Sequence, residues 1–248
     1  GCGRDLRYDE LDTASEGVAG SLAAAGIQPG ERIALYCPNG TEFVIAYLGI
    51  LKAGACVVPI NLMLNPLEVG FILRDACARG LIYHASLAGP ATQALGEAPG
   101  VRLRVCIGAN ADAGEGAADL DAMAGSGLAA PVLDLDPTEA LAAILYTSGT
   151  TGRPKGAMLS HANLGANTDA VMQALDLTPG RDRILVVLPM FHAFAATVGM
   201  LMPLLHGLSL IPVLRFDPRQ VSAAIADHGA TEIGRAHVNS SHTVIAYA

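Results

Sequence analysis

The chain has 248 residues, of which 52% are hydrophobic and only 15% are charged, and this balance excludes an intrinsically disordered chain. Lysine and arginine number 15 against 23 aspartates and glutamates, giving a net charge of −8 that, without a basic run, argues against nucleic-acid binding. Aromatic residues make up 4% and tryptophan is absent, so the core must be aliphatic.

The first 107 residues alternate between predicted helices and strands. Apolar residues at three- and four-residue spacing predict a helix over 6–25, which Gly26 ends. The elements that follow are a strand at 32–36, a helix at 42–52 capped by Thr41, a strand at 55–60, a helix at 66–78 capped by Asn65, a strand at 80–84, a helix at 86–95 and a strand at 101–107. This alternation predicts an α/β fold with doubly wound parallel sheets and flanking helices.

Residues 109–130 interrupt this pattern. They are rich in glycine, alanine and aspartate, and no lysine or arginine occurs between Arg104 and Arg153. We expect a surface connection with one helical turn near 120–124. The predicted domains are therefore a first α/β subdomain at 1–140 and the start of a second at 141–231, which opens with a strand at 141–146.

An apolar run at 184–205 is long enough to span a membrane. Pro189 and Pro203 interrupt the run, however, and His192 lies near its middle. The pattern favours a buried strand at 184–188, a turn, and an apolar helix that ends near Pro203. We expect no membrane span and no signal peptide.

Five widely spaced cysteines contain no C-x-x-C pair: Cys2, Cys37, Cys56, Cys77 and Cys106. Their odd number and wide spacing argue against a disulfide framework and against a zinc site, so no metal-ligating residue is predicted. We expect reduced, buried thiols in a cytoplasmic protein.

The strand at 141–146 leads into the segment at 146–156 (YTSGTTGRPKG), which precedes a helix opening near Ser160. Glycines let the backbone approach a ligand closely, hydroxyl and amide groups donate to phosphate oxygens, and Lys155 supplies a mobile positive charge. The spacing differs from G-x-x-x-x-G-K-[ST], the loop of ordinary NTPases. We predict a polyphosphate-binding loop formed by Thr147, Ser148, Gly149, Thr150, Thr151, Gly152 and Lys155.

This segment resembles the signature of the adenylate-forming enzymes, which include acyl-CoA synthetases, adenylation domains of peptide synthetases, and luciferases. Further blocks that resemble this family occur along the chain in the family's order, four before this segment and one after it. They lie at 7–11 (RYDEL), 38–43 (PNGTEF), 48–55 (LGILKAGA), 59–61 (PIN) and 188–192 (LPMFH). The resemblance covers about residues 6–230 and is greatest to bacterial fatty-acyl-CoA synthetases. It implies an incomplete N-terminal large domain of the adenylate-forming fold.

The resemblance implies a reaction in two steps. A carboxylate attacks the α-phosphorus of ATP and releases pyrophosphate, and a thiol, usually of coenzyme A, then displaces AMP. The loop and Lys155 would stabilise charge on the departing pyrophosphate, and Mg²⁺ would enter with the nucleotide. His192 would line the acyl and nucleotide site, without a general-base role following from its position.

The substrate class rests on weaker signals. The apolar stretch at 191–205 favours a medium or long aliphatic acid, and peripheral membrane contact is compatible with such a substrate, although an ordinary core helix has the same pattern. An adenylation domain for an amino or aryl acid is the alternative enzyme. A non-catalytic nucleotide-binding remnant is the alternative of another class.

Parts of the family pattern are missing from the sequence. It contains no Tyr-Gly-x-Thr-Glu block, no later ribose-binding aspartate and no small C-terminal domain with its adenylation lysine, for which Lys155 is no substitute. We therefore expect a partial site that is inactive by itself.

Residues 232–248 depart from the family pattern in another way. The DNA sequence GAGATCGGAAGAGCACACGTC, one frame of a common sequencing adapter, encodes residues 232–238 (EIGRAHV). Its continuation AACTCCAGTCAC encodes residues 239–242 (NSSH) once two bases are skipped. We predict a non-native tail at 232–248, whose histidines should not be interpreted as ligands.

Overall fold

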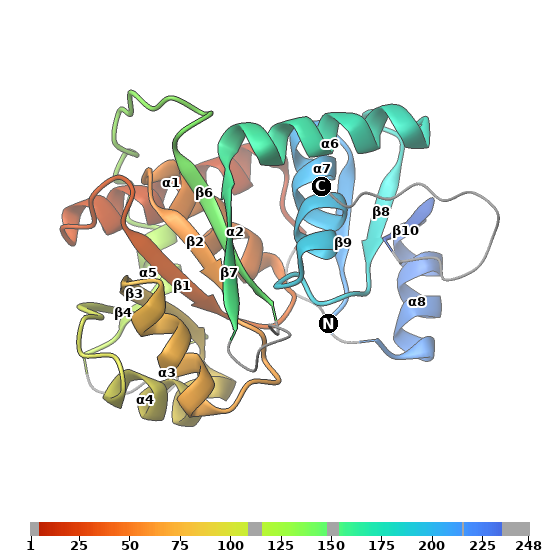
Figure 1. Ribbon diagram of the computed structural model, residues 1–248. Coiled ribbons are helices and arrows are strands. Elements are labelled where there is room, and N and C mark those ends of the chain that lie inside the picture. The colour runs from red at the N-terminus through yellow and green to blue at the C-terminus, as the bar shows by residue number, and fades with distance from the viewer. Residues whose placement is uncertain (1–4, 109–115, 148–153, 215, 235–248) are drawn as a thin grey trace. The chain divides into compact units, whose positions relative to one another are not determined.

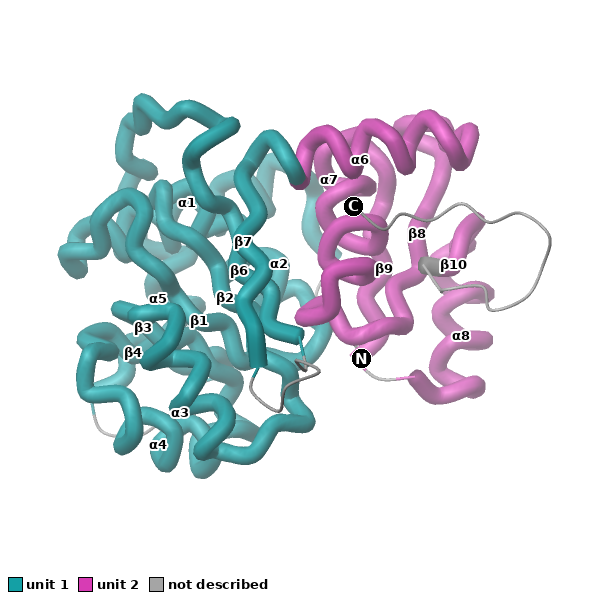
Figure 2. Tube along the Cα trace, in the orientation of Figure 1, with its two compact units in different colours: residues 1–163 teal, residues 164–248 magenta. Residues whose placement is uncertain are grey.

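The computed structural model describes residues 5–108, 116–147, 154–214 and 216–234. The chain forms two compact units, residues 1–163 and 164–248, which Figure 2 shows in two colours. None of the helices in these described ranges combines the length and the hydropathy that crossing a membrane requires.

The first unit alternates strands and helices as the sequence predicts. Its elements are α1 (Tyr8–Ala24), β1 (Arg32–Tyr36), α2 (Thr41–Lys52), β2 (Cys56–Pro59), α3 (Pro66–Asp75), β3 (Ala78–His84), a 3-10 turn η1 (Ala85–Leu87), α4 (Ala88–Gly96), β4 (Leu103–Ile107), β5 (Ala118–Asp119), α5 (Leu120–Ala124), β6 (Leu141–Thr147) and β7 (Lys155–Ser160). Helix α6 (His161–Leu175) begins in the first unit and continues into the second.

One sheet runs through the first unit in the order β5-β4-β3-β1-β2-β6-β7 (Figure 1). The pairs from β5 to β6 are parallel, which confirms the predicted α/β class. β7 is antiparallel to β6 and lies at the sheet edge, and the sequence analysis missed this strand. Its six residues follow the loop directly and are mostly polar or small, so they carry no strand pattern that can be told from a loop.

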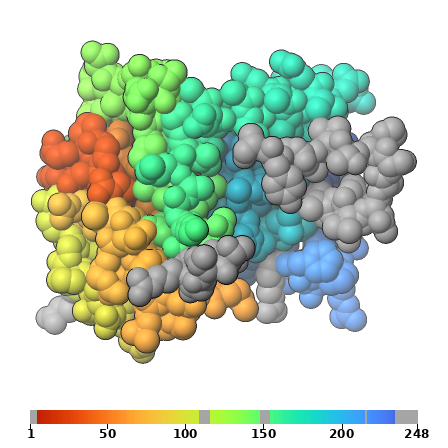
Figure 3. Space-filling model, in the orientation of Figure 1, coloured from red at the N-terminus to blue at the C-terminus, as the bar shows by residue number. Residues whose placement is uncertain are grey.

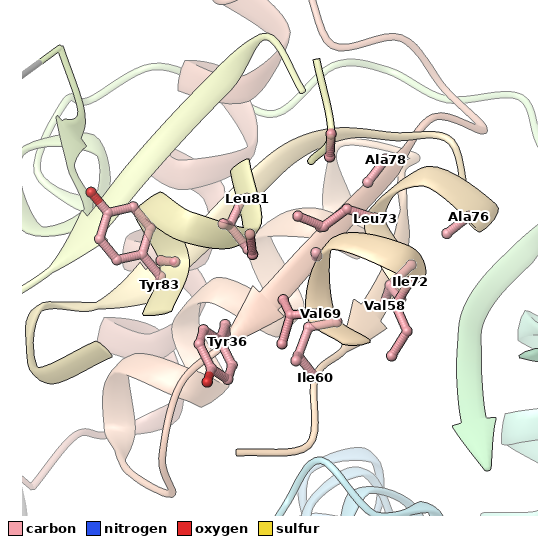
Figure 4. Close-up of a cluster of buried hydrophobic side chains, with 14 of the residues drawn as sticks. Tyr36, Val58, Ile60, Val69, Ile72, Leu73, Ala76, Ala78, Leu81 and Tyr83 are labelled. Carbon is pink, nitrogen blue, oxygen red and sulfur yellow. The ribbon is translucent and has the colours of Figure 1, made fainter. Parts of the chain in front are cut away.

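Strand alternation sends side chains to both faces of this sheet. On one face, Ala34 and Tyr36 of β1 join a buried cluster with residues of α3 and α4. Figure 4 shows Val69, Ile72 and Leu73 of α3 within this cluster. Ile33 and Leu35 of β1 are also completely buried and point to the opposite face, where α2 contacts β1 and β2. Both faces of the sheet are thus covered.

The start and the end of α3 have clear local causes. The Asn65 side chain accepts hydrogen bonds from the backbone N–H groups of Leu67 and Glu68, which confirms the predicted cap. The helix ends at Asp75, three residues earlier than predicted, and Cys77 adopts a left-handed conformation with φ of 49°. β3 begins directly after Cys77, at Ala78, so it takes up the last residue of the predicted helix. At α2, by contrast, Gly40 occupies the cap position and Thr41 is the first helical residue.

The second unit is smaller. It contains β8 (Arg183–Val186), a π-helix η2 (Ala195–Leu201), α7 (Met202–Leu205), β9 (Ser209–Pro212), α8 (Pro218–His228) and β10 (Glu232–Gly234). Its three strands form a parallel sheet in the order β10-β8-β9. A small cluster of Leu185, Val187 and Val213 is buried in it. The apolar run that met the length of a membrane span is therefore a strand, β8, followed by η2 and α7.

The division between the units differs from the boundary predicted after residue 140. β6 pairs with β2 and β7 pairs with β6, so both strands belong to the sheet of the first unit, which ends at residue 163. At the other end, Glu232–Gly234 pair with Ile184–Val186 through the backbone. Backbone pairing is open to almost any sequence, so the non-native tail at 232–248 stays a prediction, and its residues 235–248 lie outside the described ranges.

The cysteines of the described residues are unpaired thiols. Cys37, Cys56 and Cys106 are buried and Cys77 is exposed. Burial raises the pKa of the Cys56 thiol to about 12, so it stays protonated at neutral pH. The three buried thiols fit the prediction of buried cysteines, whereas the exposed Cys77 does not.

Candidate functional site

The β6–β7 hairpin carries the predicted phosphate loop. Thr147 ends β6 and Lys155 begins β7, and the two are directly opposite partners in the antiparallel ladder. Both side chains are exposed, and Figure 3 shows the green atoms of this hairpin at the surface. The hairpin therefore brings a hydroxyl and an ammonium group to the two ends of one loop.

The remaining loop candidates lie outside the described residues. These are Ser148, Gly149, Thr150, Thr151 and Gly152. Their assignment to phosphate binding stays a prediction.

Tyr146 precedes this loop and makes a long-range contact. Its phenol donates a hydrogen bond of 2.5 Å to Oδ2 of Asp75, the last residue of α3. Partial burial and the neighbouring carboxylate both raise the pKa of Tyr146, so the phenol stays protonated and acts as the donor. The base of the loop is thereby linked to the helix layer of the sheet.

Gly156 follows Lys155 and is the cross-strand partner of Tyr146. A Cβ atom at Gly156 would lie 2.7 Å from Cγ2 of Ile144 and 3.1 Å from Cζ of Tyr146. A larger residue would thus displace the Tyr146 ring, which explains in packing terms why the loop sequence ends on a glycine.

His192 belongs to the second unit. Its side chain is exposed and its ring lies 4.5 Å from the ring of Phe191, measured between centroids. Its backbone N–H donates to the carbonyl of Pro189 and its own carbonyl accepts from the N–H of Ala196, so a turn leads directly into η2. Desolvation by its surroundings lowers the pKa of His192, which favours the neutral imidazole near pH 7.

Of the three predicted site residues that the structure describes, Thr147 and Lys155 are paired in the first unit. The third, His192, belongs to the second unit. A wide turn of the π type follows it, and such turns frequently occur at functional sites. From the sequence, an ordinary apolar helix is expected in that place.

The described residues contain no group of three or more His, Cys, Asp or Glu side chains arranged to hold a metal. A pocket of about 340 Å³ lies beside the start of α1, lined by Leu6, Asp9, Glu10, Thr13, Ala14 and Ala124. This pocket contains none of the predicted site residues. At the described ends of the loop, Thr147 and Lys155 are exposed, so an anion would meet their donors there.

Asp75 and Tyr146 were missed by the sequence analysis. They lie 71 positions apart, at the end of a helix and at the end of a strand, so no local pattern connects them. The one available signal is the single tyrosine near the end of an otherwise aliphatic strand, just before a glycine-rich loop.

Comparison with known sequences identifies a family. The sequence profile of one family, described as AMP-binding enzyme, matches residues 2–234. That range includes every described residue of both units, with strands β6 and β7 among them.

Three curated relatives are acid–CoA ligases with different acids in their names. Sulfoacetate–CoA ligase of Cupriavidus necator is 34% identical over 99% of this chain and 46% of its own length. Long-chain-fatty-acid–CoA ligase FadD13 of Mycobacterium tuberculosis is 33% identical, over 90% of this chain and 42% of its own. Feruloyl-CoA synthase of Amycolatopsis sp is 37% identical, over 92% and 43%. The chain spans less than half the length of each of these relatives.

Among solved structures, the inhibitor-bound N-terminal domain of FACL13 from Mycobacterium tuberculosis is similar to this chain with a TM-score of 0.79. The sequence identity is 31%, and the match covers 91% of this chain and 54% of that one. The fold is thus that of an N-terminal domain of adenylate-forming enzymes. With the family match over 2–234 and with acid–CoA ligases as its relatives, the chain belongs to the AMP-binding enzyme family.

Proposed function

We propose that this chain is the N-terminal part of an enzyme that activates a carboxylic acid with ATP and transfers the acyl group to coenzyme A. The observation that carries the proposal is the pairing of Thr147 with Lys155 around a glycine- and hydroxyl-rich segment. Acid–CoA ligase relatives support the reaction class.

The exposed donors suit a polyphosphate better than a metal ion. Ammonium and hydroxyl groups bind phosphate oxygens, whereas Mg²⁺ prefers carboxylate and carbonyl oxygens, and the described residues contain no cluster of such carboxylates. Mg²⁺ would therefore enter with the phosphates of ATP, which supply the electrophilic phosphorus. Lys155 would offset charge on the leaving pyrophosphate, and His192 would line the acyl and nucleotide site.

A fatty acid is our proposed substrate, from the apolar residues that follow His192. Met200 and Leu201 of η2 are buried, and η2 contacts β8. The names of the relatives include sulfoacetate and feruloyl as well as a long-chain fatty acid, so an aryl or amino acid is the second candidate. A cytoplasmic location is proposed from the reduced thiols.

The loop assignment is tested with a charge variant of this chain. We expect Lys155→Ala to raise the dissociation constant for MgATP, measured by titration calorimetry, about tenfold, because one charge-assisted contact is lost. Arg104→Ala, which removes an exposed cation from β4, is the matched control and should leave the constant unchanged. Equal affinities for the parent chain and Lys155→Ala would refute the role of Lys155.

The reaction itself is tested by isotope exchange between pyrophosphate and ATP, with long-chain, aryl and amino acids as parallel substrates. We propose that this chain alone gives no exchange above background, because the blocks that complete the family's site are absent from its sequence. A longer protein that includes them should exchange, and its preferred acid identifies the substrate class. MgATP binding by this chain without exchange in the longer protein would favour the non-catalytic alternative.

A further inference from the structure

The base of the phosphate loop is weakly supported by its own strand. β7 lies at the sheet edge, and its first four residues are exposed, with Met158 at 66%. An edge strand whose side chains bury little surface is prone to local opening. Something other than the packing of β7 must hold Thr147 opposite Lys155.

Tyr146 connects the start of the loop to the rest of the first unit. Its ring contacts the buried cluster between the sheet and α3, and its Cζ would be 3.1 Å from a Cβ placed on Gly156. The ring therefore lies over the glycine of the opposite strand, as an aromatic residue does when it covers a cross-strand glycine. Its phenol donates a hydrogen bond to the carboxylate of Asp75.

Asp75 is itself held in place. It is the last residue of α3, whose apolar face packs on the sheet through Ile72 and Leu73, each 1% exposed. The hydrogen bond from Tyr146 thus connects the end of β6 next to the loop with α3, a helix that packs on the core. The next pair in the ladder is Thr147 and Lys155.

We propose that Tyr146 and Asp75 form a positioning pair that keeps Thr147 and Lys155 in register for polyphosphate binding. The polyphosphate ligand rests on the proposed function. The support that the pair gives to the register of Thr147 and Lys155 does not. Neither residue would touch the phosphate, since both would act through Thr147 and Lys155.

The test uses this chain and three substitutions. Tyr146→Phe removes only the hydroxyl and leaves the ring over Gly156. Asp75→Asn keeps an oxygen that accepts the hydrogen bond. Tyr83→Phe removes a phenol from the same buried cluster, on β3, and is the matched control.

Two quantities are measured for each variant: amide hydrogen exchange at Thr147 and Lys155, and the dissociation constant for MgATP. For Tyr146→Phe we expect both to rise about fivefold, the scale of one lost hydrogen bond at a partly exposed site. Asp75→Asn should stay within about twofold of the parent because the acceptor is kept. Tyr83→Phe should change neither quantity. If Tyr146→Phe does not fold, Asp75→Ala removes the acceptor at an exposed position and should give the same two increases.

The outcomes separate this inference from the proposed function. A parent chain that binds no MgATP contradicts the proposed loop function, while the exchange rates still decide whether the pair holds the hairpin. A parent that binds MgATP, with Tyr146→Phe unchanged in exchange or in affinity, overturns the positioning pair and leaves the loop function standing. Equal increases for Tyr146→Phe and Tyr83→Phe also overturn it, because the effect would then be general loosening of the core.

Discussion

The two units cover their sheets to different extents. In the first unit the residues of β2 are all buried, and helices cover both faces of the sheet. In the second unit the residues of β9 are exposed or half-buried, and α8 has no buried residue. Parallel sheets are normally buried on both faces. The difference indicates that the first unit carries most of the stability of the chain, and that the second opens at lower free energy.

The largest contrast is expected from deleting one apolar side chain in each unit. Leu81 of β3 is completely buried (Figure 4), whereas Ile225 of α8 is 37% exposed. Leu81→Ala should lower the free energy of unfolding by about 3 kcal/mol, through lost burial and a cavity. Ile225→Ala should lower it by less than about 1 kcal/mol. Urea titration of both variants measures the difference, and equal losses would show that the second unit is as well packed as the first.

Two helical glycines should respond to alanine with opposite signs. A Cβ at Gly49 of α2 would lie 2.5 Å from Cγ1 of Val18 in α1, so Gly49→Ala should lower the unfolding free energy by about 2 kcal/mol. Gly165 of α6 has open space around its Cα, so Gly165→Ala should gain about 0.5–1 kcal/mol from helix propensity. Thermal melting of the two variants measures whether each substitution stabilises or destabilises the chain. A stabilising Gly49→Ala would mean that α1 and α2 approach less closely than the structure indicates.

Removing a helix cap in each unit should give a smaller difference in stability between the two units. Asn65 caps α3 in the first unit, and Asp217 caps α8 in the second, each accepting two backbone N–H bonds. Asn65→Ala should lower the global unfolding free energy by about 1 kcal/mol, because α3 is part of the core. Asp217→Ala should accelerate hydrogen exchange within α8 while changing the global value much less. A global loss as large for Asp217→Ala would contradict the low stability assigned to α8.

Much of the fold could be predicted from local sequence signals. Apolar periodicity located α1 and the strands from β1 to β4, and Asn65 followed by proline marked the start of α3. The signals failed where the local pattern was weak or where distant pairing decides the structure. β7 forms because β6 offers a free edge, and the two residues of β5 pair only with β4, so neither is visible in its own sequence.

The candidate site divides in the same way. The motif identified Lys155 because hydroxyls, glycines and a cation follow one another in the chain, and the structure places it opposite Thr147. Asp75 could not be found, because its relation to Tyr146 exists only once α3 has packed on the sheet. His192 was selected by its resemblance to a family block, and its role stays a prediction.

The smallest effect concerns one histidine in each unit. Desolvation lowers the pKa of His161 in the first unit and of His192 in the second. Nε2 of His161 is buried without a hydrogen-bond partner in the described structure, so protonation there is unfavourable. Because the folded-state pKa lies below the unfolded value of about 6.5, the unfolded chain binds more protons as the pH falls through that value. Stability should therefore be complete above pH 6.5 and decrease below it.

Proton NMR titration of the histidine rings should place both pKa values below 6.5, and urea titration should show lower stability at pH 5.5 than at pH 7. His161→Gln should reduce that loss in the global transition, because the side chain belongs to the unit that dominates stability. His192→Gln should act only on hydrogen exchange in the second unit. A ring that titrates at or above 6.5 would contradict the desolvation at that position, and a global effect of His192→Gln as large as that of His161→Gln would mean that the two units unfold together.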